Sequence, residues 1–395
     1  MSYCALINYG MTIQPDGQVA LCCNANRDWS LGHISEIDDL EHAWYNHPGM
    51  IKLRYEDYET VDFVCGSCLK TKSEQENRWQ QVNVGEAHSK WVRNDNKIRF
   101  LEFTTSNICN QTCITCSSYF SSKWRKLEDE LMEYGFLQNS KQHMGIGFGS
   151  YNHNLHRLES SDIDKIKKLL PNLDRIDVKG GEPFADKNNF TILEELMKIN
   201  PTCRIHFCTN FYKVPQTFID LFKKYNHYPY LSASIDGVYD VYNYVRSTPF
   251  NQTIDNIKNW YDQTGKKVSV STSCSIYTMY NLKEYFDFFE NNLLDEVADI
   301  SFSKWVQTPN YVSGVRTLFD FEKREYVNNY LNDLKPYTKK KRFKTKNLFA
   351  LDSIKYPTTV ENKLKLRKDF RNYTRFMNLE RNINIYDLCP ELKNI

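Results

Sequence analysis

The stretch that decides the fold is IRFLEFTTSNICNQTCITC, residues 98–116. Its first part, IRFLEFTT, is rich in apolar, aromatic and β-branched residues, which predicts a buried strand. Cys109, Cys113 and Cys116 follow within one loop directly after that strand. Iron-sulfur cubanes ordinarily take four thiolates, so three local thiolates would leave one iron open to a substrate or cofactor atom. The alternatives are a zinc site that lacks one ligand, or three buried cysteines with no shared role.

Further strand-like runs alternate with helical patterns along the rest of the chain. The runs are RIDVKG (175–180), RIHFCTN (204–210), LSASIDG (231–237), VSVSTSCS (268–275) and DISFSKW (299–305). Apolar residues recur at helical spacing between them, in residues 161–170, 190–199, 217–225, 253–261 and 281–290. Strand and helix repeated in this way predict an α/β fold with parallel strands, whose site-forming loops follow the carboxyl ends of the strands.

Composition and charge limit the function classes. The 395 residues include 51 basic and 49 acidic side chains, so the net charge of +2 demands neither nucleic acid nor an anionic membrane as partner. The first residues, MSYCALINYG, lack a basic export signal, and no run approaches the ~20 apolar residues that span a bilayer. We therefore expect a cytoplasmic protein with no membrane partner and no specific nucleic acid. The cytosol keeps thiols reduced, so the twelve cysteines of the chain are not expected to form disulfides. They suggest metal or redox chemistry instead.

A second group of cysteines lies near the N-terminus: Cys4, the pair Cys22 and Cys23, Cys65 and Cys68. The turn residues of PDG (15–17) predict a hairpin that brings the first of these together. Neighbouring residues in a strand point to opposite faces, so we expect one of the pair to bind, and choose Cys22. Cys4, Cys22, Cys65 and Cys68 could then close around one metal centre, either an iron-sulfur cluster or structural zinc. The remaining cysteines beside predicted strands, Cys203, Cys208 and Cys274, are expected to be small buried apolar residues.

Candidate ligand-binding residues follow the predicted strands. The second strand ends in GGEP, where glycines allow a close backbone approach and a carboxylate can accept from an ammonium group. These residues are Gly180, Gly181, Glu182 and Pro183. Weaker candidates at or after later strand ends are Thr209, Asn210, Ser232, Ser234, Asp236 and Arg246, each of which could instead be an ordinary cap or turn residue.

The segment EFTTSNICNQTCITC (102–116) resembles the cluster loop of the radical SAM superfamily. That resemblance implies a partial (β/α)6 TIM-like barrel and a 4Fe-4S cluster whose open iron chelates S-adenosylmethionine (SAM). It also implies that GGEP holds the methionyl amino group of SAM, and that the six weaker candidates line its ribose and carboxylate. Many members of the superfamily have an aromatic residue before the third cysteine, near the adenine, where this chain has Thr115.

The N-terminal segments IQPDGQVALCC (13–23), LGHI, HAWYN, IKLR and CGSC (65–68) resemble the SPASM/Twitch domain, which holds an auxiliary 4Fe-4S cluster. The ending NLERNINIYDLCPEL (378–392) is similar to that of radical SAM proteins whose Twitch domain precedes the barrel. The resemblance implies a Twitch/SPASM-like domain over residues 1–93, a radical SAM core over 94–318 and a C-terminal extension over 319–395.

The resemblance further implies an enzyme that cleaves SAM reductively to a 5′-deoxyadenosyl radical and takes a hydrogen atom from its substrate. A peptide or protein is the first choice of substrate, because Twitch and SPASM relatives often modify peptides. Dehydrogenation or rearrangement of a small molecule such as a sugar or cyclitol is the second. An electron donor such as flavodoxin or ferredoxin is implied as a partner. A noncatalytic iron-sulfur electron carrier is the alternative from another class, and it would have no use for GGEP or Asp236.

Overall fold

The computed structural model describes residues 4, 6–23, 25–26, 28–55, 57–69, 96–135, 157–293, 295–303, 321–348 and 359–394. Contacts divide the chain into two compact units. The first unit comprises Met1–Ile108, Gly147–Phe207 and Asp220–Pro229, and the second comprises Cys109–Ile146, Cys208–Ile219 and Tyr230–Ile395. The predicted domain borders near residues 93 and 318 lie outside the described residues and stay predictions.

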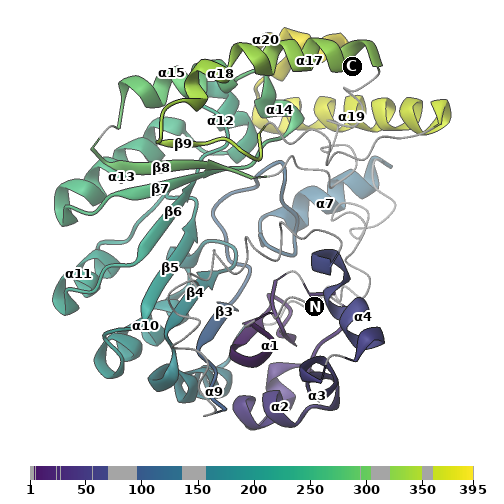
Figure 1. Ribbon diagram of the computed structural model, residues 1–395. Coiled ribbons are helices and arrows are strands. Elements are labelled where there is room, and N and C mark those ends of the chain that lie inside the picture. Colours follow the sequence, from purple (N-terminus) through teal and green to yellow (C-terminus); the bar gives the residue numbers. More distant parts are fainter. Residues whose placement is uncertain are drawn as a thin grey trace. The chain divides into compact units, whose positions relative to one another are not determined.

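All six predicted strands are present: β3 (Phe100–Thr104), β4 (Arg175–Lys179), β5 (Arg204–Thr209), β6 (Tyr230–Ser234), β7 (Val268–Thr272) and β8 (Val297–Phe302). The helices among and directly after them are α7 (Trp124–Glu133), α9 (Ser160–Leu169), α10 (Lys187–Ile199), α11 (Gln216–Tyr225), α12 (Tyr239–Arg246), α13 (Phe250–Thr264), α14 (Ile276–Met279) and α15 (Leu282–Asn291) (Figure 1). Strand β4 pairs in parallel with both β3 and β5, and β7 pairs in parallel with both β6 and β8. The predicted fold class, α/β with the strands and helices of a partial barrel, is confirmed.

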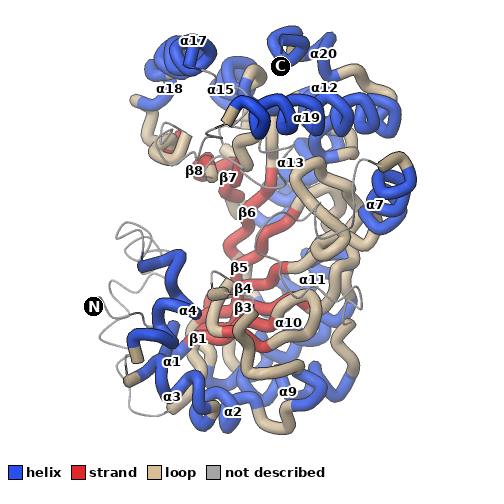
Figure 2. Tube along the Cα trace, turned by 90° about the vertical axis from the view of Figure 1, so that its right-hand side faces the viewer, coloured by secondary structure: helices blue, strands red, loops and turns tan. Residues whose placement is uncertain are grey.

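The first unit contains a sheet that the sequence did not predict in full. The N-terminal segment of this unit consists of α1 (Leu6–Tyr9), β1 (Gly10–Ile13), β2 (Val19–Ala20), α2 (Leu40–Asn46), α3 (Pro48–Arg54) and α4 (Tyr58–Leu69). The predicted hairpin is confirmed, because β1 and β2 pair antiparallel around a turn in which Gly17 has a φ of 78°. Strand β1 also pairs in parallel with β3, from Gly10 beside Phe100 to Ile13 beside Phe103. The cysteine-rich segment therefore shares one sheet with the first strands of the barrel (Figure 2).

The two faces of this sheet differ in chemistry. Ile176 and Val178 of β4 and Ile205 and Phe207 of β5 are at most 3% exposed. Because side chains alternate along a strand, the residues between them point to the opposite face. On β4 and β5 these include the charged or titratable residues Asp177 and His206, which the register places beside each other. Charged and titratable side chains gathered on one face of a sheet are candidates for a functional surface.

The second unit continues beyond β8 with a C-terminal extension. It contains α17 (Phe321–Asp333), α18 (Lys335–Thr338), β9 (Phe343–Lys344), α19 (Val360–Arg381) and α20 (Ile385–Leu388). Strand β9 pairs in parallel with β8. Helix α19, yellow in Figure 1, is joined to α12 and α14 through Thr374. The Thr374 carbonyl accepts a hydrogen bond from the Tyr244 hydroxyl, and the Thr374 hydroxyl shares one with the Tyr277 hydroxyl. No helix in the described part of the chain is both long and apolar enough to cross a membrane.

Candidate functional site

The three cysteines of the loop after β3 lie in the second unit and are largely shielded from solvent. Cys113 is buried, and Cys109 and Cys116 are partly buried. Burial, followed by the neighbouring Cys113 and Cys109 thiols, raises the pKa of the Cys116 thiol well above its ordinary value. Burial also raises the pKa of Cys113, against the nearby positive charge of Arg246. Buried thiols that lie close together resist ionisation unless a metal supplies positive charge, which is the chemistry that iron ligation provides.

Nitrogen donors contact two of these sulfurs. Arg246 Nη1 lies 3.5 Å from Cys113 Sγ, and Asn210 Nδ2 lies 3.9 Å from Cys109 Sγ. Arg246 also forms an ion pair with Asp236, with Nη2 and Oδ2 2.7 Å apart. Hydrogen bonds to the sulfurs stabilise thiolates and help to set the potential of an iron-sulfur centre. The donor set therefore fits a cluster, although the described residues contain no compact group of three or more His, Cys, Asp or Glu side chains for a single metal ion.

Four of the six weaker candidates can be placed by their contacts. Asn210 also donates to Asn110 Oδ1 at 2.6 Å, and Thr209 Oγ1 accepts from the Phe211 amide at 3.0 Å. Asp236, paired with Arg246, accepts in addition from the Ser273 amide at 2.6 Å. Ser232 and Ser234 are partly buried on β6. The structure thus brings Asn210 and Arg246 to the cysteine loop, whereas contacts with SAM stay a prediction for all six.

The GGEP turn lies in the first unit and packs closely on the backbone of residues 106–108. The Glu182 amide donates to the Ile108 carbonyl at 2.8 Å, and Ile108 is the residue before Cys109 in the chain. A Cβ on Gly181 would lie 2.2 Å from that carbonyl oxygen, and Gly180 has a φ of 136°. Both positions therefore require glycine. The turn is built directly against the segment that leads into the cysteine loop.

Glu182 and Pro183 begin a short 3₁₀ helix, Pro183–Ala185. The carboxylate of Glu182 is buried and its Oε1 accepts from the Phe184 amide at 3.2 Å, so it caps this helix. Phe184 in turn stacks on Phe207, with ring centroids 4.9 Å apart. The sequence suggested a carboxylate available to an ammonium group; in the structure the same carboxylate also has a structural role.

The N-terminal cysteines come from three segments: Cys4 precedes α1, Cys22 and Cys23 follow β2, and Cys65 and Cys68 belong to α4. Cys22 is buried, and Cys4 and Cys65 are partly buried. The Asn26 amide donates to the Val64 carbonyl at 2.9 Å, which joins the segment after Cys23 to the residue before Cys65. Cys68 belongs to the same helix, but its side chain lies outside the described residues. Strand β2 ends at Ala20, so the alternation used to choose Cys22 over Cys23 does not apply to this pair.

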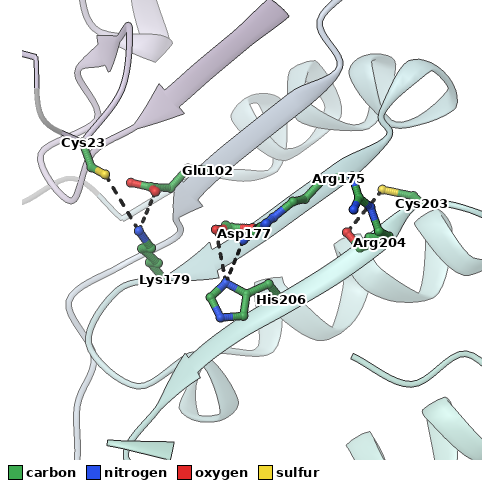
Figure 3. A network of polar contacts seen from close by, with 8 residues as sticks. All are labelled: Cys23, Glu102, Arg175, Asp177, Lys179, Cys203, Arg204 and His206. Atoms are coloured by element: carbon green, nitrogen blue, oxygen red, sulfur yellow. Dashed lines mark hydrogen bonds and ion pairs between the residues drawn. The ribbon is translucent and has the colours of Figure 1, made fainter. Parts of the chain in front are cut away.

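Cys23 is exposed and contacts the charged face of the first unit, which Figure 3 shows. Lys179 Nζ lies 3.9 Å from Cys23 Sγ and 2.5 Å from Glu102 Oε2. Arg175 binds both carboxylate oxygens of Asp177, at 2.5 and 2.9 Å, and His206 Nδ1 lies 3.1 Å from Oδ2. Burial alone would raise the pKa of Asp177, but hydrogen bonds from His206 and Arg175 outweigh it and lower the pKa to about 2. Asp177 therefore stays ionised at neutral pH.

This charged face was missed as a site, although its signal was present. RIDVK and RIHFC alternate charged and apolar residues with the period of a strand.

The cysteines beside the strands, Cys203, Cys208 and Cys274, were expected to be small buried apolar residues. Cys203 and Cys274 are fully buried as expected, and burial raises the pKa of the Cys203 thiol to about 12. The expectation was wrong for Cys208, which is only partly buried because it alternates along β5 with the buried residues Phe207 and Thr209.

Comparisons with known proteins agree with the two cysteine groups. Residues 103–289 match the model of the radical SAM superfamily, and residues 4–69 match SPASM, described as an iron-sulfur cluster-binding domain. The second match favours an iron-sulfur cluster over zinc at the N-terminal cysteines. The two domains together imply 4Fe-4S clusters and SAM as the cofactors. No curated protein matches the chain.

Several solved structures are similar at low identity. SuiB of Streptococcus suis, bound to the precursor peptide SuiA, is 14% identical; the match covers 69% of this chain and 53% of that one, with a TM-score of 0.40. Native anSMEcpe with bound AdoMet is 13% identical over 58% and 62% of the two chains, with a TM-score of 0.36. A radical SAM methyltransferase from Sphaerobacter thermophilus is 14% identical over 49% and 60%, with a TM-score of 0.33.

The matched region spans 53% of SuiB and 62% of anSMEcpe. Within this chain, the two family matches include both cysteine groups and all the candidate residues from Gly180 to Arg246. Residues 103–289 of the chain are thus similar to the radical SAM superfamily, and residues 4–69, ahead of them, to an iron-sulfur cluster-binding SPASM domain.

Proposed function

We propose that this chain is a radical SAM enzyme that modifies a peptide or protein. The observation that carries the proposal is the loop of Cys109, Cys113 and Cys116, whose clustered thiols receive nitrogen donors from Asn210 and Arg246. When bound, the cluster and SAM supply reductive cleavage of SAM to methionine and a 5′-deoxyadenosyl radical, which takes a hydrogen atom from the substrate. A donor such as flavodoxin or ferredoxin is the proposed source of the electron.

The chain's own residues have three proposed roles. The cysteine loop holds three corners of the first cluster, with Arg246 and Asn210 beside the sulfurs. Gly180, Gly181, Glu182 and Pro183 form the turn proposed to hold the methionyl amino group of SAM. Cys4, Cys22, Cys65 and Cys68 are the proposed ligands of the auxiliary cluster, and four protein thiolates there would leave no iron open for SAM.

A peptide is proposed as the substrate by analogy with Twitch and SPASM proteins, which often modify peptides. The test incubates anaerobically reconstituted protein with SAM, a reductant and short peptides encoded beside its gene, followed by mass spectrometry. We expect 5′-deoxyadenosine and a peptide of altered mass. Formation of 5′-deoxyadenosine without any altered peptide, together with turnover of a sugar or cyclitol, would replace the peptide by a small-molecule substrate. Absence of 5′-deoxyadenosine would refute the enzyme proposal.

We propose that the charged face of β4 and β5 contacts the substrate, and that replacing Asp177 by asparagine uncouples SAM cleavage from substrate turnover. The amide cannot hold Arg175 and His206 as the ionised carboxylate does, and a misplaced substrate contact costs about 100-fold in rate. We expect product to fall by about that factor while 5′-deoxyadenosine formation without substrate stays within about twofold. Chromatography of both products measures this.

The matched control is Asp164→Asn, since Asp164 is an exposed carboxylate of α9 whose ion pair with Lys167 lies at the surface. It should change neither quantity. Equal losses of product and of substrate-free 5′-deoxyadenosine in Asp177→Asn would show that the charged face serves stability or SAM binding instead.

A further inference from the structure

The backbone of the cysteine loop is held by hydrogen bonds from three directions, all within the second unit. The Thr112 amide donates to Ser247 Oγ at 2.8 Å, and the Ile114 amide donates to the Val245 carbonyl at 2.8 Å. The Cys113 carbonyl accepts from Trp124 Nε1 at 2.9 Å. The end of α12 and the beginning of α7 thus bind both sides of the middle cysteine.

The third direction is the C-terminal helix α19, which lies beyond the residues that match the radical SAM model. Arg381 donates from Nη2 to the Thr112 carbonyl and from Nε to the Tyr244 carbonyl, the latter at 3.0 Å. The Tyr373 hydroxyl donates to the Ile114 carbonyl at 3.2 Å. The carbonyls on both sides of Cys113 therefore depend on α19.

Arg381 differs from Arg246 in how its charge is compensated. Arg246 is ion-paired with Asp236. Within the described residues Arg381 forms no ion pair with a carboxylate, and it donates instead to the backbone carbonyls of Thr112 and Tyr244. Burial lowers the pKa of Arg381, while the neighbouring Tyr373 and Cys113 act in the opposite sense. Arg381 is partly buried. Removing a cation from water is costly unless an anion lies nearby, and a cluster bound by thiolates carries net negative charge.

We infer that Arg381 and Tyr373 are positioning residues for the cluster loop, and that the charge of Arg381 raises the reduction potential of the cluster bound by Cys109, Cys113 and Cys116. The inference rests on the proposed assignment of these three cysteines as ligands. A positive charge nearby stabilises the reduced cluster, which is the more negative state. The C-terminal extension is then part of the redox site and not a separate appendage.

The test compares Arg381→Gln, which removes the charge, with Arg381→Lys, which keeps it. Both are measured in protein whose auxiliary-site cysteines Cys4, Cys22, Cys65 and Cys68 are replaced by alanine, so that one cluster remains. Redox titration followed by electron paramagnetic resonance (EPR) gives the potential. We expect Arg381→Gln to disfavour reduction about tenfold, which is 59 mV for one electron, and Arg381→Lys to stay much closer to the parent. Arg375→Gln, at an exposed position of the same helix, is the control and should not shift the potential.

Tyr373→Phe provides a second test, because it keeps the ring and removes only the hydroxyl that binds Ile114. We expect its cluster to be lost to an iron chelator roughly fivefold faster, with an unchanged potential. Unshifted potentials in both Arg381 variants, or a chelation rate for Tyr373→Phe equal to the parent's, would overturn the inference. A parent protein that assembles no cluster on these three cysteines would instead overturn the proposed function, and iron analysis before titration separates the two failures.

Discussion

Replacement of Cys113 by alanine is expected to abolish reductive cleavage of SAM, with a loss of at least about 1,000-fold, or roughly 4 kcal/mol in the barrier. Cys113 is the buried, middle thiol of the loop, and its sulfur accepts a hydrogen bond from Arg246. Removing it leaves two local thiolates for a cluster that requires three corners to be held. Quantification of 5′-deoxyadenosine from reconstituted, reduced protein measures the effect.

Two comparisons make this result specific. Cys203→Ala removes a fully buried thiol that has no proposed role as a ligand, and this variant should retain SAM cleavage. The triple variant with alanine at Cys109, Cys113 and Cys116 should still bind about four irons per chain, because the auxiliary cluster has its own cysteines. Full SAM cleavage by Cys113→Ala would contradict the assignment of the loop. Chelatable zinc in the triple variant would contradict the auxiliary cluster.

Replacement of Gly181 by alanine is expected to destabilise the first unit by roughly 3 kcal/mol or more and to weaken SAM binding at least about tenfold. The added Cβ would lie 2.2 Å from the Ile108 carbonyl oxygen, which is a backbone atom that cannot rotate away. The turn and the segment ahead of Cys109 would have to separate, and the Glu182–Ile108 hydrogen bond would be lost. Thermal unfolding and isothermal titration with SAM measure the two effects.

Gly265→Ala is the matched control. Gly265 ends α13 with a φ of 65°, and a Cβ there would meet no atom within 4 Å. Its cost is therefore limited to backbone strain, about 1 kcal/mol, with SAM binding unchanged. If Gly181→Ala were no more destabilising than Gly265→Ala, the close packing of the GGEP turn on Ile108 would be wrong.

The repeat of strands and helices could be predicted from the sequence because each element has its own local pattern. β-Rich runs separated by helical periodicity identified β3 to β8, and the turn around Gly17 identified the β1–β2 hairpin. The cysteine loop was equally visible, since its three thiols lie within eight residues, Cys109 to Cys116. Chemistry that is contiguous in the chain can be inferred before the fold is known.

Contacts between distant segments could not be predicted in this way. The pairing of β1 with β3 joins residues about 90 positions apart, and Arg381 reaches Thr112 across 269 positions. No periodicity within either segment indicates its partner. The capping role of the Glu182 carboxylate was hidden for a different reason, because a motif identifies residue types but not which side-chain atom satisfies which backbone group.

The most direct test of the central claim is the EPR spectrum of the reduced cluster on Cys109, Cys113 and Cys116, recorded with and without SAM in protein that lacks the auxiliary cysteines. If these three thiolates leave one iron open, SAM should change the spectrum, and SAM labelled with ¹⁷O in its carboxylate or ¹⁵N in its amino group should show hyperfine coupling to the cluster. A spectrum identical with and without saturating SAM, with no such coupling, would mean that a fourth protein ligand occupies that iron, and would contradict the account.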